Sequence, residues 1–529
     1  MKAKSVLLGL SLVALPVLAQ TPVYLDDSKP VEERVEDALS RMTLEEKIAV
    51  THAQSKFCSP GVARLGIPEF WMTDGPHGIR PEVLWDEWDQ AGWTNDSCVA
   101  FPALTCLAAT WDTDMSMLYG KSIGEEARYR NKTVLLGPGV NIYRTPLNGR
   151  NFEYMGEDPY LAGRMVVPYV QGVQQNGVAA CVKHYALNNQ EVNRHTTNVI
   201  VDDRALYEIY LPAFKAAVQE GKAWSIMGAY NLYKGQHACH NQYLLNDILK
   251  GEWGFDGVVV SDWGGVHDTD QAITNGLDME FGSWTDGLSN GASNAYDNYY
   301  LADPYLERIQ SGKAGTKELD DKVRRILRLA FRTTMDRNRP YGAMRSPEHY
   351  DAARKIGEAG IVLLQNNGNL LPIDLAKTKK IAVIGPMAKN GWDLLGSWCG
   401  HGKDTDVEML YDGLTAEFGG DAELRYAMGC KPQGNDRSGF AGALDVARWS
   451  DVVIVCLGEM LTWSGENASR STIALPQIQE ELVKELKEAG KPIILVLSNG
   501  RPLELNRMEP LCDAILEIWQ PGINGARSM

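Results

Sequence analysis

The chain has 529 residues, 44% hydrophobic and 23% charged, a composition typical of soluble globular proteins but too long for a single hydrophobic core. A formal net charge of −16 argues against nucleic acid or an anionic membrane surface as a partner. Nine cysteines without metal-like spacing favour buried thiols over a disulfide framework, although one or two disulfides are compatible with the sequence.

Residues 1–19 have the pattern of a secretory signal peptide. Lys2 and Lys4 form a basic start, residues 6–18 are an apolar run, and the run ends in a suitable cleavage site after Ala19. The run is too short to span a bilayer, and no later stretch is long and apolar enough to do so. We therefore expect an exported protein, periplasmic or extracellular, without a membrane span.

Short apolar runs alternate with helix-like segments in the first two-thirds of the chain. This alternation predicts βα units and a parallel sheet. Several runs end in a polar or charged side chain, and such residues meet at one mouth in a (β/α)8 barrel enzyme. The helix-like segments are 110–130, 202–220 and 319–335. The strand-like runs are 70–74, 134–138, 180–184, 225–230, 258–262 and 277–280.

A second α/β pattern follows a break at residues 337–342. Its strand-like runs, separated by helices such as 477–489, predict an open and mostly parallel sheet. Gly385 ends the first of these runs, but no GxGxxG follows it, which counts against a dinucleotide-binding enzyme. The strand-like runs are 380–385, 452–457, 493–497 and 514–519.

The residues available for chemistry are carboxylates, a Lys-His pair and many aromatics. No P-loop, HExxH, GxSxG or zinc-ligand spacing is present. The set suits glycoside hydrolysis, in which two carboxylates flank the bond and aromatic rings stack on the apolar faces of sugars. Asp262 ends the β-branched run 258–260, so a barrel would place it at the face where such folds keep their active sites.

Four motifs, in family order, resemble glycoside hydrolase family 3 in its β-glucosidase form. The resemblance covers roughly residues 30–525. It implies a (β/α)8 TIM-like barrel followed by an α/β sandwich, and retaining hydrolysis of β-linked sugars at the non-reducing end without a metal or organic cofactor. The motifs are TDGPHGIR at 73–80, RNFEYMGEDPY at 150–160, KHY at 183–185 and DGVVVSDW at 256–263.

The resemblance and the two patterns together predict the domain organisation. We expect a catalytic barrel over residues 30–340, a linker over 341–355 and a sandwich domain over 356–529. Family members usually continue beyond the segment that ends this chain. The resemblance therefore implies that the sandwich is incomplete at its C-terminus, with an exposed sheet edge.

The resemblance also assigns roles in the sugar pocket. Asp262 matches the family nucleophile, and the alternative is a solvated carboxylate at a strand end. Asp74, Arg150, Lys183 and His184 match residues that hold the sugar in the −1 subsite. For Lys183 and His184 the alternative is a structural ion pair and a core histidine.

Three further residues match positions around the nucleophile. Met227 and Tyr230 match flanking positions, and Trp263 resembles a platform between the sugar and the leaving group. Core packing is the alternative for each of them.

The acid/base residue is expected in a loop of the second domain, after the strand-like run 452–457. Glu466 is the better match and Glu459 the runner-up, while either could be a solvated loop carboxylate. Only docking of the two domains brings Asp262 and Glu466 to the roughly 5–5.5 Å of a retaining mechanism. The role requires a raised pKa at Glu466 in the free enzyme, which a nearby ionised Asp262 would help to provide.

The leading hypothesis is an exo-acting β-glucosidase. Asp74 supports glucose, because a carboxylate can accept hydrogen bonds from sugar hydroxyls far from the anomeric carbon. A β-xylosidase or broad β-glycosidase is the near alternative, and a truncated sugar-binding relative with little activity is another. The loop 282–303 is expected near the mouth, where it would help to shape the +1 subsite.

Overall fold

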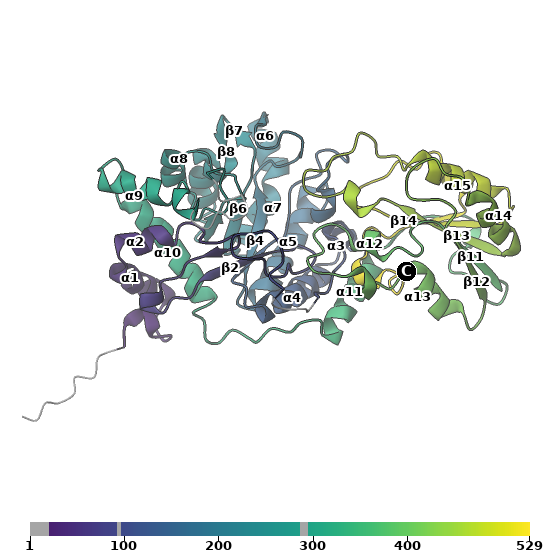
Figure 1. The fold of residues 1–529 in the computed structure, drawn as a ribbon, viewed down its shortest axis with the longest axis horizontal. Coiled ribbons are helices and arrows are strands. Elements are labelled where there is room, and N and C mark those ends of the chain that lie inside the picture. The colour runs from purple at the N-terminus through teal and green to yellow at the C-terminus, as the bar shows by residue number, and fades with distance from the viewer. Residues whose placement is uncertain (1–20, 93–96, 286–294) are drawn as a thin grey trace, which may run out of the picture.

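The computed structural model describes residues 21–92, 97–285 and 295–529 as two α/β domains that lie side by side (Figure 1). The expected signal peptide lies outside the described residues. Within these three ranges, no helix is both long enough and apolar enough to cross a membrane.

The first domain is built on a ring of strands. Five strands run parallel in the order β2, β3, β4, β6, β9, and the short β1 pairs antiparallel with β2. Beyond β9, the run 277–280 is not a full strand. It forms isolated parallel bridges to Val260 of β9 and to His52, which precedes β1, and so extends the ring from β9 toward β1. The strands are β1 (Cys58–Ser59), β2 (Phe70–Asp74), β3 (Val134–Leu136), β4 (Ala179–Tyr185), β6 (Ser225–Gly228) and β9 (Val258–Val260).

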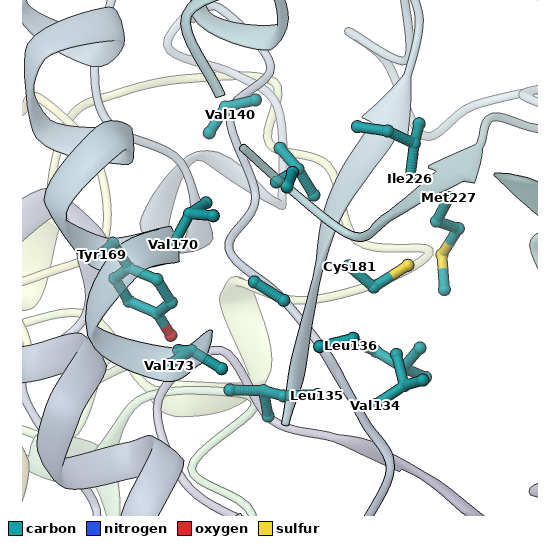
Figure 2. Close-up of a cluster of buried hydrophobic side chains, with 14 of the residues drawn as sticks. Val134, Leu135, Leu136, Val140, Tyr169, Val170, Val173, Cys181, Ile226 and Met227 are labelled. Atoms are coloured by element: carbon teal, nitrogen blue, oxygen red, sulfur yellow. The ribbon is translucent and has the colours of Figure 1, made fainter. Parts of the chain in front are cut away.

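Helices cover the outside of this TIM-like barrel because both faces of its strands are apolar. In Figure 2, Val173 of α5 lies close to Leu135, whereas Cys181 and Met227 lie on the side of the strands away from α5. The helices are α1 (Val31–Arg41), α2 (Leu44–Ala49), α3 (Leu104–Ala109), α4 (Thr113–Tyr129), α5 (Pro159–Gln174), α6 (Asp203–Ala205), η4 (Leu206–Tyr210), α7 (Pro212–Gln219), η6 (Tyr243–Glu252), α8 (Thr269–Thr274), α9 (Asp303–Gln310) and α10 (Lys317–Arg332).

The single helix expected over residues 202–220 is divided into three pieces. Asp202 caps α6 by accepting a hydrogen bond from the backbone N–H of Ala205 (2.8 Å), and a π-helical turn, η4, follows. Pro212 then begins α7. Because proline has no N–H to donate, the helical hydrogen bonding restarts there, although the apolar periodicity runs on.

The second domain is a six-stranded sheet with the order β10-β15-β14-β13-β11-β12, parallel except for β10. All four expected runs are strands, and two unexpected ones, β10 and β12, form the edges. On β10, Leu363 and Leu364 are 51% and 52% exposed. The strands are β10 (Val362–Asn366), β11 (Lys380–Ile384), β12 (Glu423–Ala427), β13 (Val452–Gly458), β14 (Ile493–Ser498) and β15 (Ala514–Glu517). The helices are α12 (Gly391–Leu395), α13 (Leu410–Phe418), α14 (Phe440–Trp449) and α15 (Gln477–Lys487).

Much of the range expected to be a linker is helical. α11 (Pro347–Gly360) packs against α3 and α4 of the barrel. The buried His349 ring contacts Glu125 (2.8 Å) and Glu126 (3.0 Å) of α4. The connection between the domains is therefore anchored on the barrel.

The cysteines behave as the sequence predicts. All nine lie in the described ranges, and all are buried and free. The chain is thus held together by its cores rather than by disulfides.

Candidate active site

A cavity of about 310 Å³ lies where the carboxyl ends of the barrel strands meet loops of the second domain. The short loops after β2, β4, β6 and β9 each contribute to its wall, as expected for a barrel active site. Every residue that the sequence favoured for the site lines this cavity. These residues are Asp74, Arg150, Lys183, His184, Met227, Tyr230, Asp262, Trp263 and Glu466.

Asp262 lies just beyond β9 and is 7% exposed. Its Oδ1 accepts a hydrogen bond from the backbone N–H of Trp263 (2.8 Å). Its Oδ2 has no partner at ideal hydrogen-bond geometry in the described part of the chain and lies 3.8 Å from Nε2 of His184, while the Tyr230 hydroxyl is close enough to the carboxylate to help lower its pKa. Burial, with Arg150 and Lys183 nearby, holds the pKa of His184 well below its usual range, so this imidazole is neutral. One carboxylate oxygen of Asp262 is therefore fixed and the other is available.

Two buried cations share one buried counter-ion. Glu153 accepts hydrogen bonds from Nε (3.0 Å) and Nη2 (2.9 Å) of Arg150, and its Oε1 lies 3.8 Å from Nζ of Lys183. All three side chains are at most 2% exposed. This bidentate pairing fixes the orientation of the guanidinium. Glu153 belongs to the RNFEYMGEDPY motif, but no role was predicted for it.

Asp74 also lies in a defined ion pair. Its Oδ2 accepts a hydrogen bond from Nη1 of Arg80 (2.8 Å), six residues further along the same motif. Arg80 itself lines the cavity and stacks over the ring of Phe57 at 5.0 Å. The pair presents a carboxylate and a guanidinium together at the cavity wall.

Glu466 reaches the cavity from the loop after β13. Its Oε1 accepts a hydrogen bond from Nη2 of Arg194 and lies 4.0 Å from Nη1 of Arg150. Arg194 is held in turn by Glu191, through a 2.7 Å hydrogen bond from Nη1. Glu191 also accepts a hydrogen bond from the backbone N–H of Asn467 (2.9 Å). The barrel loop after β4 therefore holds the glutamate of the second domain from two sides.

The prediction of a raised pKa at Glu466 is wrong for the substrate-free site. Burial raises the pKa of Glu466, but Arg150 and Arg194 outweigh it, and the pKa lies below its ordinary value. At Asp262 the balance is opposite, because burial and the nearby Glu466 carboxylate raise the pKa to about 6. The proton of this carboxylate pair is therefore held mainly by Asp262.

The structure also separates the two acid/base candidates. Glu459 does not line the cavity, and it forms a buried ion pair with Arg501 at 3.1 Å, with side-chain exposures of 3% and 0%. Its carboxylate has a structural partner and no route to a bound ligand. Glu466 is the candidate that the geometry supports.

Several cavity residues escaped sequence reasoning. Trp398, from a loop of the second domain, places its ring 5.9 Å from the guanidinium carbon of Arg150 and 5.4 Å from Nζ of Lys183. Only docking of the domains brings it there, so no local pattern indicates it. Arg80 could have been found from its motif. The remaining unforeseen lining residues are Phe57, Trp88, Arg194, His195 and Asn467. Trp284 also lines the cavity, and it belongs to the loop 282–303 that was expected near the mouth, of which residues 286–294 lie outside the described ranges.

The fold and the site together define a glycoside hydrolase. Two carboxylates from different domains face one sugar-sized cavity whose walls carry cations, neutral polar groups and aromatic rings. The chain matches the Glycosyl hydrolase family 3 N terminal domain over residues 58–329 and the Glycosyl hydrolase family 3 C-terminal domain over residues 361–529. It belongs to glycoside hydrolase family 3.

Individual relatives agree with this assignment. β-Glucosidase BoGH3A of Bacteroides ovatus is 51% identical, over 96% of this chain and 70% of its own length. Thermostable β-glucosidase B of Acetivibrio thermocellus is 35% identical, over 93% of this chain and 62% of its own. The structure of β-glucosidase 3B from Thermotoga neapolitana in complex with glucose aligns with a TM-score of 0.81 at 29% identity, covering 93% of this chain and 73% of that one. The chain thus spans roughly two-thirds of the length of these relatives.

Proposed function

We propose that the chain is an exo-acting, retaining β-glucosidase that removes β-D-glucosyl residues from the non-reducing ends of oligosaccharides. The observation that carries the proposal is the meeting of Asp262 and Glu466, from two domains, in one cavity of about 310 Å³. That space suits one or two sugar rings, as an exo-acting enzyme requires. The family and the printed names of the relatives support glucosides as substrates.

The first chemical step uses the free oxygen of Asp262. Oδ2 attacks the anomeric carbon while Oδ1 stays bonded to the N–H of Trp263, and protonated Glu466 donates its proton to the departing oxygen. The product is a covalent glucosyl-enzyme and a free aglycone. Water, deprotonated by Glu466, then releases glucose with the original anomeric configuration.

Substrate has to change the proton balance of the empty site. A sugar that covers Glu466 excludes water from a carboxylate that is 29% exposed in the free enzyme, which raises its pKa. The proton that Asp262 holds in the empty site would then pass to Glu466. Binding thereby prepares both carboxylates for their roles.

Two variants test the assignment. Asp262→Ala should abolish turnover, because it removes the nucleophile that forms the glucosyl-enzyme. Glu466→Ala should lose about 10²–10⁴-fold in kcat/KM on alkyl glucosides while sparing substrates whose leaving group needs no proton. Wild-type activity in Asp262→Ala would contradict the proposal.

The choice of glucose needs its own test. Kinetics on nitrophenyl β-glucoside and nitrophenyl β-xyloside should favour the glucoside in kcat/KM. A preference for the xyloside would instead assign the chain as a β-xylosidase. Binding of glucose without turnover of either substrate would indicate a sugar-binding protein with little activity.

We also propose that the chain is exported to the periplasm or beyond the cell. The support is the basic start, apolar run and small-residue cleavage site within residues 1–19. N-terminal sequencing of the mature protein should begin at Gln20. An N-terminus at Met1 in a cytoplasmic fraction would contradict export.

A further inference from the structure

Arg501 lies fully buried where the second domain meets the barrel. Its Nη2 donates hydrogen bonds to the carbonyl of Trp463 (2.8 Å) and to Oγ of Ser464 (3.1 Å). Its Nε donates to Glu459 (3.1 Å), the buried counter-ion described above. Within the second domain, the guanidinium of Arg501 therefore holds the segment immediately before Glu466 by hydrogen bonds.

The same guanidinium also reaches into the barrel domain. Nη1 of Arg501 donates to the carbonyls of Pro146 (3.3 Å) and Asn148 (3.5 Å). These carbonyls lie just before Arg150, whose guanidinium is part of the cavity wall. Arg501 thus contacts two chain segments that carry charged groups of the active site, the one before Arg150 and the one before Glu466.

Backbone contacts join the same two segments on either side of Glu466. The N–H of Gly465 donates to the carbonyl of Gly149 (2.7 Å), and the N–H of Arg470 donates to that of Leu147 (3.0 Å). Between them, residues 148 and 469 form an antiparallel bridge. Glu466 therefore projects from a loop that is fastened to the barrel at both ends.

An arginine suits this position better than a lysine would. Its planar fork offers five donors in fixed directions, and here three nitrogens serve five acceptors. A lysine has one nitrogen and cannot span both domains at once. The buried pairing with Glu459 fixes the fork, because losing one partner of a buried pair leaves an uncompensated charge.

We infer that Arg501 is a positioning residue that seats the acid/base loop, residues 460–470, against the barrel segment 146–149 and so fixes Glu466 at the reaction centre. The inference rests on the proposed role of Glu466. The buried Glu459–Arg501 pair then has a function beyond stability. General acid catalysis requires the carboxyl of Glu466 to be placed to within about 1 Å of its productive position.

The test compares two folded variants with a matched control. Arg501→Lys keeps the charge but loses most of the fork. Ser464→Ala removes a single acceptor and keeps the buried pair, so it should fold in any event. Arg507→Lys is the control, because Arg507 follows on the same segment but is 70% exposed and forms a surface ion pair with Glu480 (3.1 Å).

The readout is kcat/KM across β-glucosides whose leaving groups differ in pKa, with the thermal midpoint of each variant checked. Arg501→Lys should lose about 10–100-fold on an alkyl glucoside and less than about threefold on dinitrophenyl glucoside, which needs no acid. Ser464→Ala should show a smaller loss with the same dependence. Arg507→Lys should match the wild type throughout.

A parallel measurement on Glu466→Ala distinguishes failure of the positioning role of Arg501 from failure of the acid/base role of Glu466. If Glu466→Ala shows the leaving-group dependence but Arg501→Lys and Ser464→Ala lose activity equally on all substrates, or not at all, the positioning role is overturned and the proposed function stands. If Glu466→Ala shows no such dependence, the proposed acid/base role fails, and the role of Arg501 fails with it.

Discussion

At the scale of single residues, the charges around the two carboxylates determine where the proton of the site lies. Arg150 and Arg194 favour ionised Glu466, whereas burial and Glu466 itself disfavour ionised Asp262. The productive form, with Asp262 ionised and Glu466 protonated, is therefore the minor arrangement of a pair that shares one proton in the free enzyme. Such a pair titrates as a unit.

This arrangement predicts the pH dependence of kcat/KM, which reports the free enzyme. The shared proton leaves as the pH rises through the pKa of Asp262, about 6. We expect kcat/KM to decline above about pH 6, because the doubly ionised pair has no acid. A pH–rate profile on nitrophenyl β-glucoside measures this limb directly.

The variant Arg194→Gln tests whether nearby arginines determine the pH at which kcat/KM declines. Arg194 lowers the pKa of both carboxylates, so its removal should move the alkaline limb to higher pH. Arg204→Gln is the control, since Arg204 is 83% exposed and forms a surface ion pair with Glu208. An alkaline limb that stays in place or moves to lower pH in Arg194→Gln would contradict this electrostatic account.

At the scale of elements, the sequence predicted the longest strands and the helices α4, α10 and α15, because their apolar patterns are strong, but it did not predict the long helices α1, α5 and α11. β4, β9, β13 and β14 are almost entirely buried and correspond to clear apolar runs. β12 was missed because Glu423 and Arg425, which are exposed on one face of this edge strand, interrupt the apolar run.

The segment 277–280 contains a carboxylate with an unusual pKa. Glu280 is fully buried, one of its oxygens accepts from the N–H of Leu301 (2.8 Å), and burial raises its pKa to about 8. In the unfolded chain the pKa returns to about 4.3. Between these values the folded state holds a proton that the unfolded state has lost, so Glu280 makes stability fall as the pH rises.

We therefore predict that Glu280→Gln weakens this pH dependence. The amide that replaces the carboxylate keeps an acceptor for the N–H of Leu301 but cannot ionise. The variant should therefore exceed the wild type in free energy of unfolding by about 1–3 kcal/mol at about pH 8.5, and by less at about pH 5. Thermal unfolding at both pH values measures the difference, with the exposed Glu33→Gln as control. If the free energy of unfolding changed equally with pH in the wild type and in Glu280→Gln, the ionisation of Glu280 would not be the cause of the pH dependence.

At the scale of the whole molecule, the active site exists only where the domains interlock. Gly78, in the motif that carries Asp74, approaches the Cys399–Gly400 turn of the second domain so closely that a Cβ on Gly400 would lie 2.3 Å from Gly78. The turn also carries Trp398 into the cavity. Glycine is required here by contact as well as by a φ of +63°.

Gly400→Ala should therefore separate the domains at this contact. We expect a loss of more than about tenfold in kcat/KM and a lower thermal midpoint. Gly66→Ala is the matched control, because Gly66 has a similar φ of +68° but nothing within 4 Å of an added Cβ. It should lose only about 1 kcal/mol of stability and no activity. Equal effects of the two substitutions would mean that backbone strain, and not docking, explains the loss.

Because the site forms only where the two domains meet, the sequence could predict only part of it. Asp262, Asp74 and Lys183 lie in motifs on or beside strands, so pattern and resemblance indicate them. Trp398 and Arg501 acquire their contacts only when distant segments meet, and nothing local marks them. The pKa of Glu466 was mispredicted for the same reason, because the arginines that set it come from the other domain.

The central claim is that Asp262 forms a covalent glucosyl-enzyme. Incubation with a 2-deoxy-2-fluoro-β-glucoside carrying a dinitrophenyl leaving group, followed by proteolysis and mass spectrometry, tests it directly. We expect one equivalent of fluoroglucose on the peptide that contains Asp262, slow release by water, and no label in Asp262→Ala. A label on another carboxylate, or steady hydrolysis of ordinary glucosides with inversion and no trapped sugar, would contradict it.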